Sequence, residues 1–498
     1  MHPDPKRWMV LLTVSAGLLL ITLDNSILYT ALPTLTHELG ATGKQGLWII
    51  NAYPLVMAGL LLGAGTLGDR IGHSRMFNIG LVLFGLSSIL AAYSPSAPIL
   101  IGARACLAVG AAAMMPATLA LIRVTFTEER ERNLAIAIWG SLSVVGAALG
   151  PIVGGLLLAK FWWGSVFLIN VPVVVLALIG SALYAPSNRT DASRPWDLWS
   201  SVLALVVLSG LVVCIKEVAT GTNHLELVIG AAVAALICAV LFVRRQAALP
   251  YPLLDFGLFR HPAFMSGVLA AGFATFTIGG LQLVTTQRFQ LVANYTPLEA
   301  GMLVAAVAVG CLPTAMIGGA YLHRIGLRIL IGGGLIVAAL GSASIALLLP
   351  AGVGWVVAGC LVTGAGLGAV MSVASSAIIG TAPVHRAGMA SSVEEVSYEF
   401  GSLTAVALLG SLLPNLYAAF LQLPAGAPEE ARQSLMNAID LARTAVDGDQ
   451  LLHAANLAFD RAYVLVVLVV AGMLALGSII TWRILRGFDG PASSNLSH

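Results

Sequence analysis

The sequence predicts an all-α polytopic membrane protein with fourteen transmembrane helices. Only 10% of its 498 residues are charged, 58% are hydrophobic, and the mean hydropathy is +0.93. A soluble protein of this length needs a charged surface around its core, and this composition cannot supply one. The charges instead gather in short clusters between apolar runs of about 20 residues, the length that crosses a bilayer. The net charge of +2 offers no basic patch for nucleic acid.

Apolar runs of spanning length occur fourteen times along the chain. The first follows Lys6 and Arg7 and contains Asp24. Because no small-residue cleavage site follows it closely, we expect a retained helix rather than a signal peptide. The predicted spans are 9–31, 47–67, 76–94, 97–121, 133–158, 164–184, 197–218, 224–243, 262–285, 299–321, 327–349, 353–379, 391–415 and 461–485.

The distribution of Lys and Arg predicts the orientation. With fourteen spans both termini lie on one side, and 17 of the 25 Lys and Arg residues fall in segments on that side. Seven fall on the other side, and Arg104 lies inside a span. Because cytoplasmic loops carry the excess of positive charge, we expect both termini in the cytoplasm.

An internal repeat organises the spans. A shift of 254 residues places segment 70–72, Arg-Ile-Gly, on segment 324–326 and Cys106 on Cys360. We therefore predict a six-helix bundle at 1–190, two inserted helices at 191–250, and a second six-helix bundle at 251–498. Parallel repeats of this kind build alternating-access carriers, with the substrate site between the halves near the membrane midplane.

One long loop, 416–460, joins the last two predicted spans on the outer face. Leu435, Ile439, Ala442 and Val446 recur there at helical spacing. The spacing predicts a short amphipathic helix that lies on the membrane surface or caps the outer mouth. A partly ordered loop is the alternative.

A glycine-rich motif with fixed charges lies in the loop after the second span. Glycines permit a tight turn, and a carboxylate there can accept hydrogen bonds from a helix N-terminus and pair with arginines across the gap. We expect a conformational latch rather than ordinary positive-inside charge. Its predicted members are Gly65, Asp69, Arg70, Gly72 and Arg75, with Arg130 and Arg132 as partners in the next inner loop. This segment resembles the G-x-L-x-D-R-x-G loop signature of the major facilitator superfamily, which implies that superfamily's fold over essentially the whole chain.

A second motif lies in the fifth span. Gly146, Gly150 and Gly154 recur every four residues on one helix face, which lets another helix approach closely. Pro151 removes a backbone hydrogen bond and bends the helix, and Gly155 completes the motif. The pattern resembles the G-x-x-x-G-P-x-x-G-G signature of antiporters in the superfamily, which implies export. Generic small-residue packing is the alternative.

The first span carries Asp24 in the segment 23–33, which resembles the L-D-x-T-I-V-N-V-A-L-P element of drug:proton antiporters. Ser26 and Tyr29 depart from that pattern. An intramembrane carboxylate is costly unless it faces a cavity or a partner, so we expect a cation or proton site; a hydrogen-bonded structural carboxylate is the alternative.

Segments 162–172 and 253–260 resemble the fourteen-helix drug:proton antiporter subgroup, with the greatest likeness to bacterial methyl viologen and quaternary ammonium exporters. The resemblance implies the bacterial inner membrane.

Two further sets of charges lie in spans. Arg104 occupies the place of a superfamily arginine thought to couple proton movement to the binding site, although Leu107 and Ala108 replace its usual Gln and Gly neighbours. A structural salt bridge is the alternative. Glu394, Glu395 and Glu399 open the thirteenth span, and the helix dipole explains the first two but not Glu399, two turns in. One of the three is expected to be a second protonatable site.

These residues predict proton-coupled export of lipophilic organic cations. A buried carboxylate can load and unload protons, so that a proton and a cation compete for Asp24. Aromatic and Met side chains would supply cation–π and adaptable apolar contacts, with core packing as the alternative for each. The candidates are Tyr29, Trp48, Tyr53, Trp139 and Met114.

Proteins of other functional classes would show different sequence features. The alternative with the same fold is an uptake symporter or an exporter of another small metabolite, and a symporter would be expected to lack the Gly-Pro motif of the fifth span. A membrane-embedded enzyme or sensor would need a catalytic constellation. The nine His show no metal spacing, and no phosphate-binding loop is present. We therefore expect no metal and no cofactor, energy from the proton gradient, and a monomer whose partners are small cations, protons and lipid.

Overall fold

The computed structural model describes residues 6–126, 128–186, 197–220, 225–249, 252–382, 387–424, 427–443 and 447–488, and every regular element in those ranges is helical. The first half contains α1 (Lys6–Glu38), α2 (Gly43–Ile71), α3 (His73–Ala92), α4 (Ala97–Thr125), α5 (Glu129–Lys160), α6 (Ser165–Leu168) and α7 (Asn170–Tyr184). The inserted pair is α8 (Leu198–Thr220) and α9 (Leu225–Ala248).

The second half begins with a short 3-10 turn, Leu258–Arg260, and continues through α10 (Pro262–Leu291) and α11 (Pro297–Ile325). A π-helical segment, Ile329–Gly333, leads into α12 (Gly334–Leu347), and α13 (Val353–Thr381) and α14 (Ala387–Phe420) follow. The chain ends with α15 (Leu435–Ala442) and α16 (Gly448–Ile484).

Twelve of the described helical segments are long and apolar enough to cross a membrane. The runs predicted at 47–67 and 133–158 correspond to two further long helices, α2 and α5, of 29 and 32 residues. The sixth predicted run corresponds to α6 and α7, which together form one apolar segment of spanning length, Ser165–Tyr184, with helical backbone angles at Ile169 between them.

Corresponding helices of the two halves begin and end alike. Thr42 and Thr296, 254 residues apart, each form a capping box at the start of α2 and α11. The same helices end before Gly72 and Gly326, whose φ angles are +97° and +84°. A positive φ is strained for residues with a Cβ, so glycine allows the chain to turn sharply into the next helix. The repeat therefore has a structural basis at both ends of this helix.

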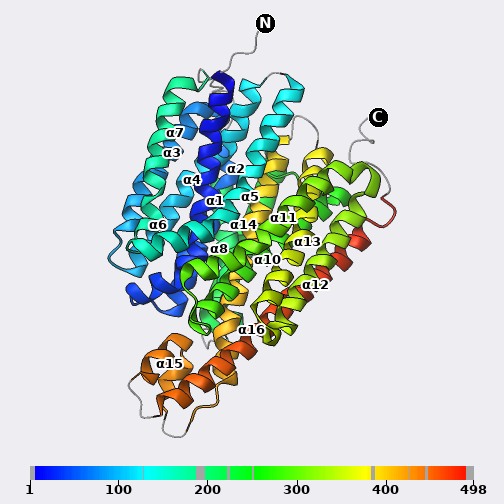
Figure 1. Ribbon diagram of the computed structural model, residues 1–498. Coiled ribbons are helices and arrows are strands. Elements are labelled where there is room, and N and C mark those ends of the chain that lie inside the picture. The colour runs from blue at the N-terminus through cyan, green and yellow to red at the C-terminus, as the bar shows by residue number, and fades with distance from the viewer. Residues whose placement is uncertain are drawn as a thin grey trace.

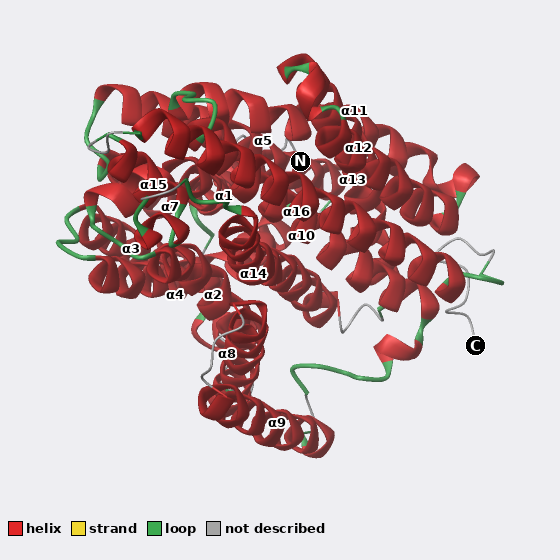
Figure 2. Cartoon of the chain, turned by 90° about the horizontal axis from the view of Figure 1, so that it is seen from below, coloured by secondary structure: helices red, strands yellow, loops and turns green. Residues whose placement is uncertain are grey.

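Each half has its own apolar core, and the halves meet along two seams. α5 packs against α11 on one side, and α2 approaches α14 on the other. α8 contacts both α2 and α14, whereas α9 packs mainly on α8 and lies outermost (Figure 2). An apolar cluster joins α8 to the seam: Leu55 of α2, Val212 of α8 and Leu403 of α14 are all buried in it.

The segment after α14 forms a helical extension at the end of the bundle opposite the start of α1 and the end of α16 (Figure 1). The predicted amphipathic helix is confirmed as α15, where Leu435 is buried and Ile439 is half-buried; Val446 lies outside the described residues. Arg432 donates hydrogen bonds to the carbonyl of Ala418, in the last turn of α14, and to that of Leu421, the residue that follows the helix. Its predicted placement at the membrane surface or outer mouth stays a prediction.

Candidate functional site

Asp24 lies in α1 and is 2% exposed. One carboxylate oxygen forms a salt bridge with Arg104 of α4, and the other accepts a hydrogen bond of 2.8 Å from the side-chain amide of Asn170, the first residue of α7. The same amide donates to the hydroxyl of Ser88 in α3 at 3.2 Å. Four helices of the first half therefore converge on this carboxylate.

Arg104 is fully buried, at 0% exposed. Its Nε donates to the carbonyl of Ile49 in α2 at 3.3 Å, and its guanidinium lies 4.6 Å from the ring centroid of Tyr53. Its Nη2 has no hydrogen-bond partner among the described residues. Buried charges are tolerated when they are paired and hydrogen-bonded, so the Asp24 partnership stabilises Arg104 while one donor stays free.

The three acids of α14 have different surroundings. Glu394 is 6% exposed and accepts hydrogen bonds from Tyr398 at 2.9 Å and Ser375 at 3.3 Å. Glu395 lies close enough to Glu394 and Glu399 to feel their charges. The Oε2 of Glu399 is buried without a hydrogen-bond partner among the described residues. Both oxygens of Glu394 therefore accept a hydrogen bond, whereas one buried oxygen of Glu399 accepts none from the described residues.

A hydrogen bond across the halves fixes the position of Glu399 relative to Asp24. The hydroxyls of Tyr29 in α1 and Ser402 in α14 are 2.9 Å apart, and both helices run toward the end of the bundle that carries α15 (Figure 1). Asp24 precedes Tyr29 by five residues and Glu399 precedes Ser402 by three. At 1.5 Å per residue, the two carboxylates differ in depth by only about 3 Å.

Arg104 lies within electrostatic reach of Glu399 as well as of Asp24. The charge of Glu399 also acts on the phenol groups of Tyr29 and Tyr53. The structure thus pairs Asp24 with Arg104 inside the first half, with the ring of Tyr53 against the guanidinium. Tyr29 joins this half to α14, the helix that carries Glu399.

Two of the other predicted wall residues, Trp48 and Met114, pack in apolar surroundings. Trp48 packs against the apolar cluster at α8, and Met114 is fully buried where α3 and α4 touch, against the position of Gly80. Trp139 is 8% exposed, and its indole N–H has no hydrogen-bond partner among the described residues. Met114 therefore fits the core-packing alternative better than a place in a binding wall.

The backbone of the predicted latch is a tight turn. α2 ends at Ile71, Gly72 takes a positive φ, and α3 starts at His73. Gly65 faces Pro116 of α4, and Arg70 and Arg75 are exposed. The side chains of Asp69, Arg130 and Arg132 lie outside the described part of the structure, so their pairing stays a prediction.

The glycines of α5 face two different helices. A Cβ on Gly146 would lie 2.0 Å from Thr22 Oγ1, and one on Gly150 would lie 2.5 Å from Ser26 Cβ, both in α1. Gly154 also faces α1, at Ile27, which confirms that one face of α5 admits a close neighbour. Gly155 instead faces α11, and a Cβ there would lie 2.3 Å from Leu298 Cα. Pro151, inside α5, has its carbonyl 2.3 Å from the Cβ position of Gly301 in α11.

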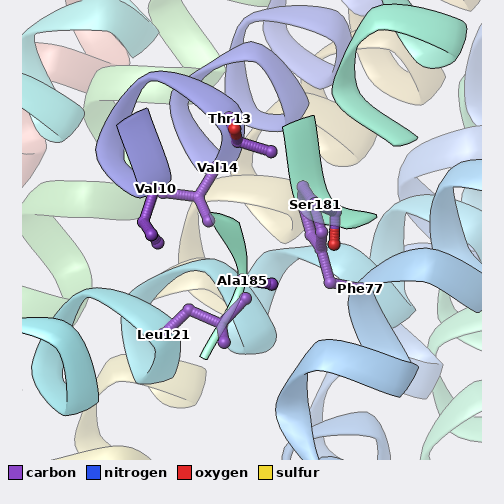
Figure 3. Close-up of a pocket in the computed structure, with 7 residues that line it drawn as sticks. All are labelled: Val10, Thr13, Val14, Phe77, Leu121, Ser181 and Ala185. Atoms are coloured by element: carbon purple, nitrogen blue, oxygen red, sulfur yellow. The ribbon is translucent and has the colours of Figure 1, made fainter. Parts of the chain in front are cut away.

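A small cavity lies inside the first half, between α1, α3, α4 and α7 (Figure 3). Its volume is about 10 Å³, enough for roughly one water molecule and far too small for an organic cation. Its lining residues are Val10, Thr13, Val14, Phe77, Leu121, Ser181 and Ala185. Within the described ranges, no group of His, Cys, Asp or Glu is arranged to hold a metal ion.

Sequence reasoning missed Asn170 as a site residue. The segment Ile169-Asn170-Val171-Pro172 served only as a likeness to a subgroup, although an amide inside an apolar run is itself a signal for a buried polar partner. The pairing of Asp24 with Arg104 matches the structural alternative weighed for each residue, and it does not test whether either takes part in transport.

Comparisons with known proteins agree with this geometry. A sequence model of the Major Facilitator Superfamily matches residues 14–406. The methyl viologen resistance protein SmvA of Salmonella typhimurium is 36% identical over 484 residues, which cover 96% of this chain and 98% of SmvA. The multidrug efflux pump LfrA of Mycolicibacterium smegmatis is 36% identical over 485 residues, which cover 95% of each chain.

Solved structures show the same fold at lower identity. A bacterial homologue of the human lysosomal transporter Spinster, in an inward-facing and unoccupied conformation, matches with a TM-score of 0.66 and 17% identity. The match covers 97% of this chain and 98% of that one. The peptide transporter POT in complex with sulfate matches with a TM-score of 0.64 and 15% identity, over 97% of this chain and 96% of that one. The paired helical halves, the glycine turn after α2 and these full-length likenesses together place the chain in the major facilitator superfamily of membrane transporters.

Proposed function

We propose that this protein exports lipophilic organic cations across the bacterial inner membrane by alternating access, in exchange for protons. Its substrates on this proposal include quaternary ammonium compounds, methyl viologen, and cationic dyes and biocides. The relatives named for methyl viologen resistance and multidrug efflux support the substrate class. The glycine motif of α5 supports export rather than uptake.

One observation carries the proposal: a buried Asp24–Arg104 pair lies inside the first half, and Glu399 lies at nearly the same depth on α14, the helix that contacts this half through Ser402 and Tyr29. Ionisable groups in a membrane interior are costly and mark substrate paths or proton relays. An exchanger needs a carboxylate whose occupancy by a proton and by a cation exclude each other, and Asp24 and Glu399 supply that chemistry. No cofactor takes part on this proposal.

The finer architecture belongs to the same proposal. Fourteen spans, with α2 and α5 added to the twelve clearly apolar helices, give bundles at 1–190 and 251–498, an inserted pair at 191–250, and cytoplasmic termini. The chain works as a monomer, and the loop motif after α2 opens and closes as a latch through Asp69 and the arginines 130 and 132.

A resistance panel tests the proposal. Cells that express the protein should tolerate mono- and divalent organic cations better than empty-vector cells, and a protonophore should remove the difference. Asp24→Asn should abolish resistance while leaving the amount of membrane protein unchanged, whereas Asp440→Asn, at an exposed ion pair of α15, should retain it. Normal resistance in the Asp24→Asn strain, or export that survives collapse of both the pH gradient and the voltage, would contradict the proposal.

A further inference from the structure

The two carboxylates, Asp24 and Glu399, are not equivalent as cation sites. Both oxygens of Asp24 already accept from side chains, one from Arg104 and one from Asn170. An organic cation that bound Asp24 would have to displace a buried guanidinium, and would leave that positive charge unpaired beside it. Removing one partner of a buried pair is strongly unfavourable, so Asp24 is poorly placed to receive a second cation.

Glu399 has the opposite character. One of its oxygens is buried and accepts no hydrogen bond from the described residues. The face of α14 that carries it is turned toward the first half, because Ser402, one turn further on, contacts Tyr29. Tyr29 brings an aromatic side chain to this face of α14 through its contact with Ser402. A carboxylate beside aromatic rings is the chemistry that recognises an apolar organic cation.

The net charge of Asp24, Arg104 and Glu399 matches one monovalent cation. Asp24, Arg104 and Glu399 together carry one net negative charge when all three are ionised, and one monovalent cation neutralises it. Among the described residues, Tyr29, Tyr53 and Glu395 are further titratable groups whose electrostatics depend on the charge of Asp24 or Glu399. The Nη2 of Arg104 is a buried donor without a partner among the described residues, so Arg104 can donate hydrogen bonds to a second carboxylate.

We propose that Glu399 is the carboxylate that binds the organic cation, and that Asp24 keeps Glu399 available by holding Arg104. This inference rests on the proposed function and replaces direct competition at Asp24 with competition through Arg104. A proton from outside adds to the Asp24 carboxylate and forms an O–H bond, which weakens its hold on the guanidinium. Arg104, still charged, then pairs with Glu399 and displaces the cation outward. Loss of the proton to the cytoplasm restores the Asp24–Arg104 pair and frees Glu399.

The net charge is the same after either exchange partner binds, because a cation on Glu399 or a proton on Asp24 each adds one positive charge. Asn170 supports the cycle, since its amide donates to the Asp24 oxygen that does not face Arg104. In this cycle Arg104 carries the coupling and touches both acids in turn.

Charge rescue in the purified full-length protein tests the inference. Binding of tetraphenylphosphonium, a monovalent aromatic cation, is measured by isothermal titration calorimetry at pH 8. Glu399→Gln should weaken binding at least about tenfold, since its charge partner to the cation is lost. Asp24→Asn should weaken binding to a similar extent, because the released Arg104 pairs with Glu399. The double variant Asp24→Asn with Arg104→Gln should recover binding to within about threefold of wild type.

The double variant distinguishes cation binding at Glu399 from cation binding at Asp24. If Asp24 itself binds the cation, the double variant stays as weak as Asp24→Asn alone, and the inference is overturned. Asp460→Asn, which removes a carboxylate from the ion pair with Arg288 near the start of the α16 span, is the matched control and should bind as wild type does. Where the double variant is not monodisperse, the single variant decides: wild-type affinity in Glu399→Gln overturns the inference, and a loss that Glu399→Asp partly restores supports it.

The failure of this inference and that of the proposed function have different signatures. Proton-driven export in vesicles, together with unchanged cation binding in Glu399→Gln, would reject Glu399 as the cation-binding residue and would still support the proposed exporter. Absence of proton dependence in the wild-type protein would reject the exchanger itself, whatever the variants bind.

Discussion

Addition of one methyl group at Gly155 should force the two halves apart on the α5–α11 seam. A Cβ at this position lies 2.3 Å from Leu298 Cα and 2.6 Å from its backbone nitrogen, whereas ordinary contact begins at 3.4 Å. The obstacle is backbone in the first turn of α11, so no side-chain rotation relieves it. α5 and α11 must separate by roughly an ångström, at an overpacking cost of about 1–3 kcal/mol.

That cost falls on one conformation of the transporter, because only the state with this seam closed contains the contact. A change of about 1–3 kcal/mol shifts the balance between two states by about 5- to 150-fold. We therefore expect Gly155→Ala to slow export of a fluorescent cation in everted vesicles within this range. Hydrogen exchange at the start of α11, residues 297–303, should accelerate.

The neighbouring glycine supplies the matched control. A Cβ at Gly154 lies 3.1 Å from Ile27 Cγ2, a side-chain methyl group in the same half, and the nearest backbone atom, the Ile27 carbonyl oxygen, is 3.4 Å away. Gly154→Ala should therefore leave export and exchange at α11 close to wild type. Wild-type export and unchanged exchange in Gly155→Ala would refute the claim that this seam closes against backbone, and equal effects of both variants would show a general loss of packing instead.

Three further perturbations follow from contacts described above. Asn170→Leu should lower the melting temperature in detergent, because it leaves one oxygen of Asp24 without its donor, at a cost of about 1–3 kcal/mol. Asp197, just before the α8 span, is buried, which alone would raise its pKa, but hydrogen bonds from Arg245 and Ser200 outweigh burial and hold the pKa below its usual 3.8. Its stabilising effect is therefore present above pH 3.8 and is lost as the pH falls through the folded pKa, so Asp197→Asn should lower the melting temperature at pH 7 and the difference should shrink at pH 3. Arg432→Ala removes the donor to two carbonyls at the end of α14, and limited proteolysis should then cut within 427–443 faster.

Each of these outcomes has a contrary result. An unchanged melting temperature in Asn170→Leu would mean that the amide adds nothing to the buried cluster. A pH-independent difference for Asp197→Asn would place the effect in packing rather than in charge. For the loop, Arg443→Ala is the control, since the Arg443 side chain is largely exposed and, within the described residues, pairs with Asp440 one turn away. Equal proteolysis of both variants would contradict a specific role for Arg432.

Apolar runs and glycine punctuation predicted much of the helical framework, because both act through local physics. Every predicted run falls on a helical segment, and Gly72 turns the chain where the motif placed a turn. Helix ends were less predictable. α16 begins at Gly448 rather than near 461, and α14 runs from Ala387 to Phe420. Hydropathy reports where lipid contact is favourable, whereas backbone hydrogen bonds continue a helix past that limit.

The candidate site was predictable in composition but not in pairing. Asp24 and Arg104 each stood out as charges inside apolar runs, yet they are 80 residues apart, and only the packing of α1 on α4 makes them partners. The difference between Glu394 and Glu399 likewise depends on neighbours from other helices, Ser375 for one and the first half for the other. Sequence periodicity contains no such information.

The inserted helix α8 makes the two sides of the transporter unequal toward lipid. On the α5–α11 side the halves touch backbone to backbone. On the α2–α14 side a third helix, α8, packs against the seam through Val212 and Leu205. A lipophilic molecule that approaches the α2–α14 side from the bilayer would therefore contact α8 first. When the halves rock, α8 must either move with one of them or slide along it. Bulky substitutions on the packed face of α8 should therefore lower the turnover rate, although they lie far from the charged site.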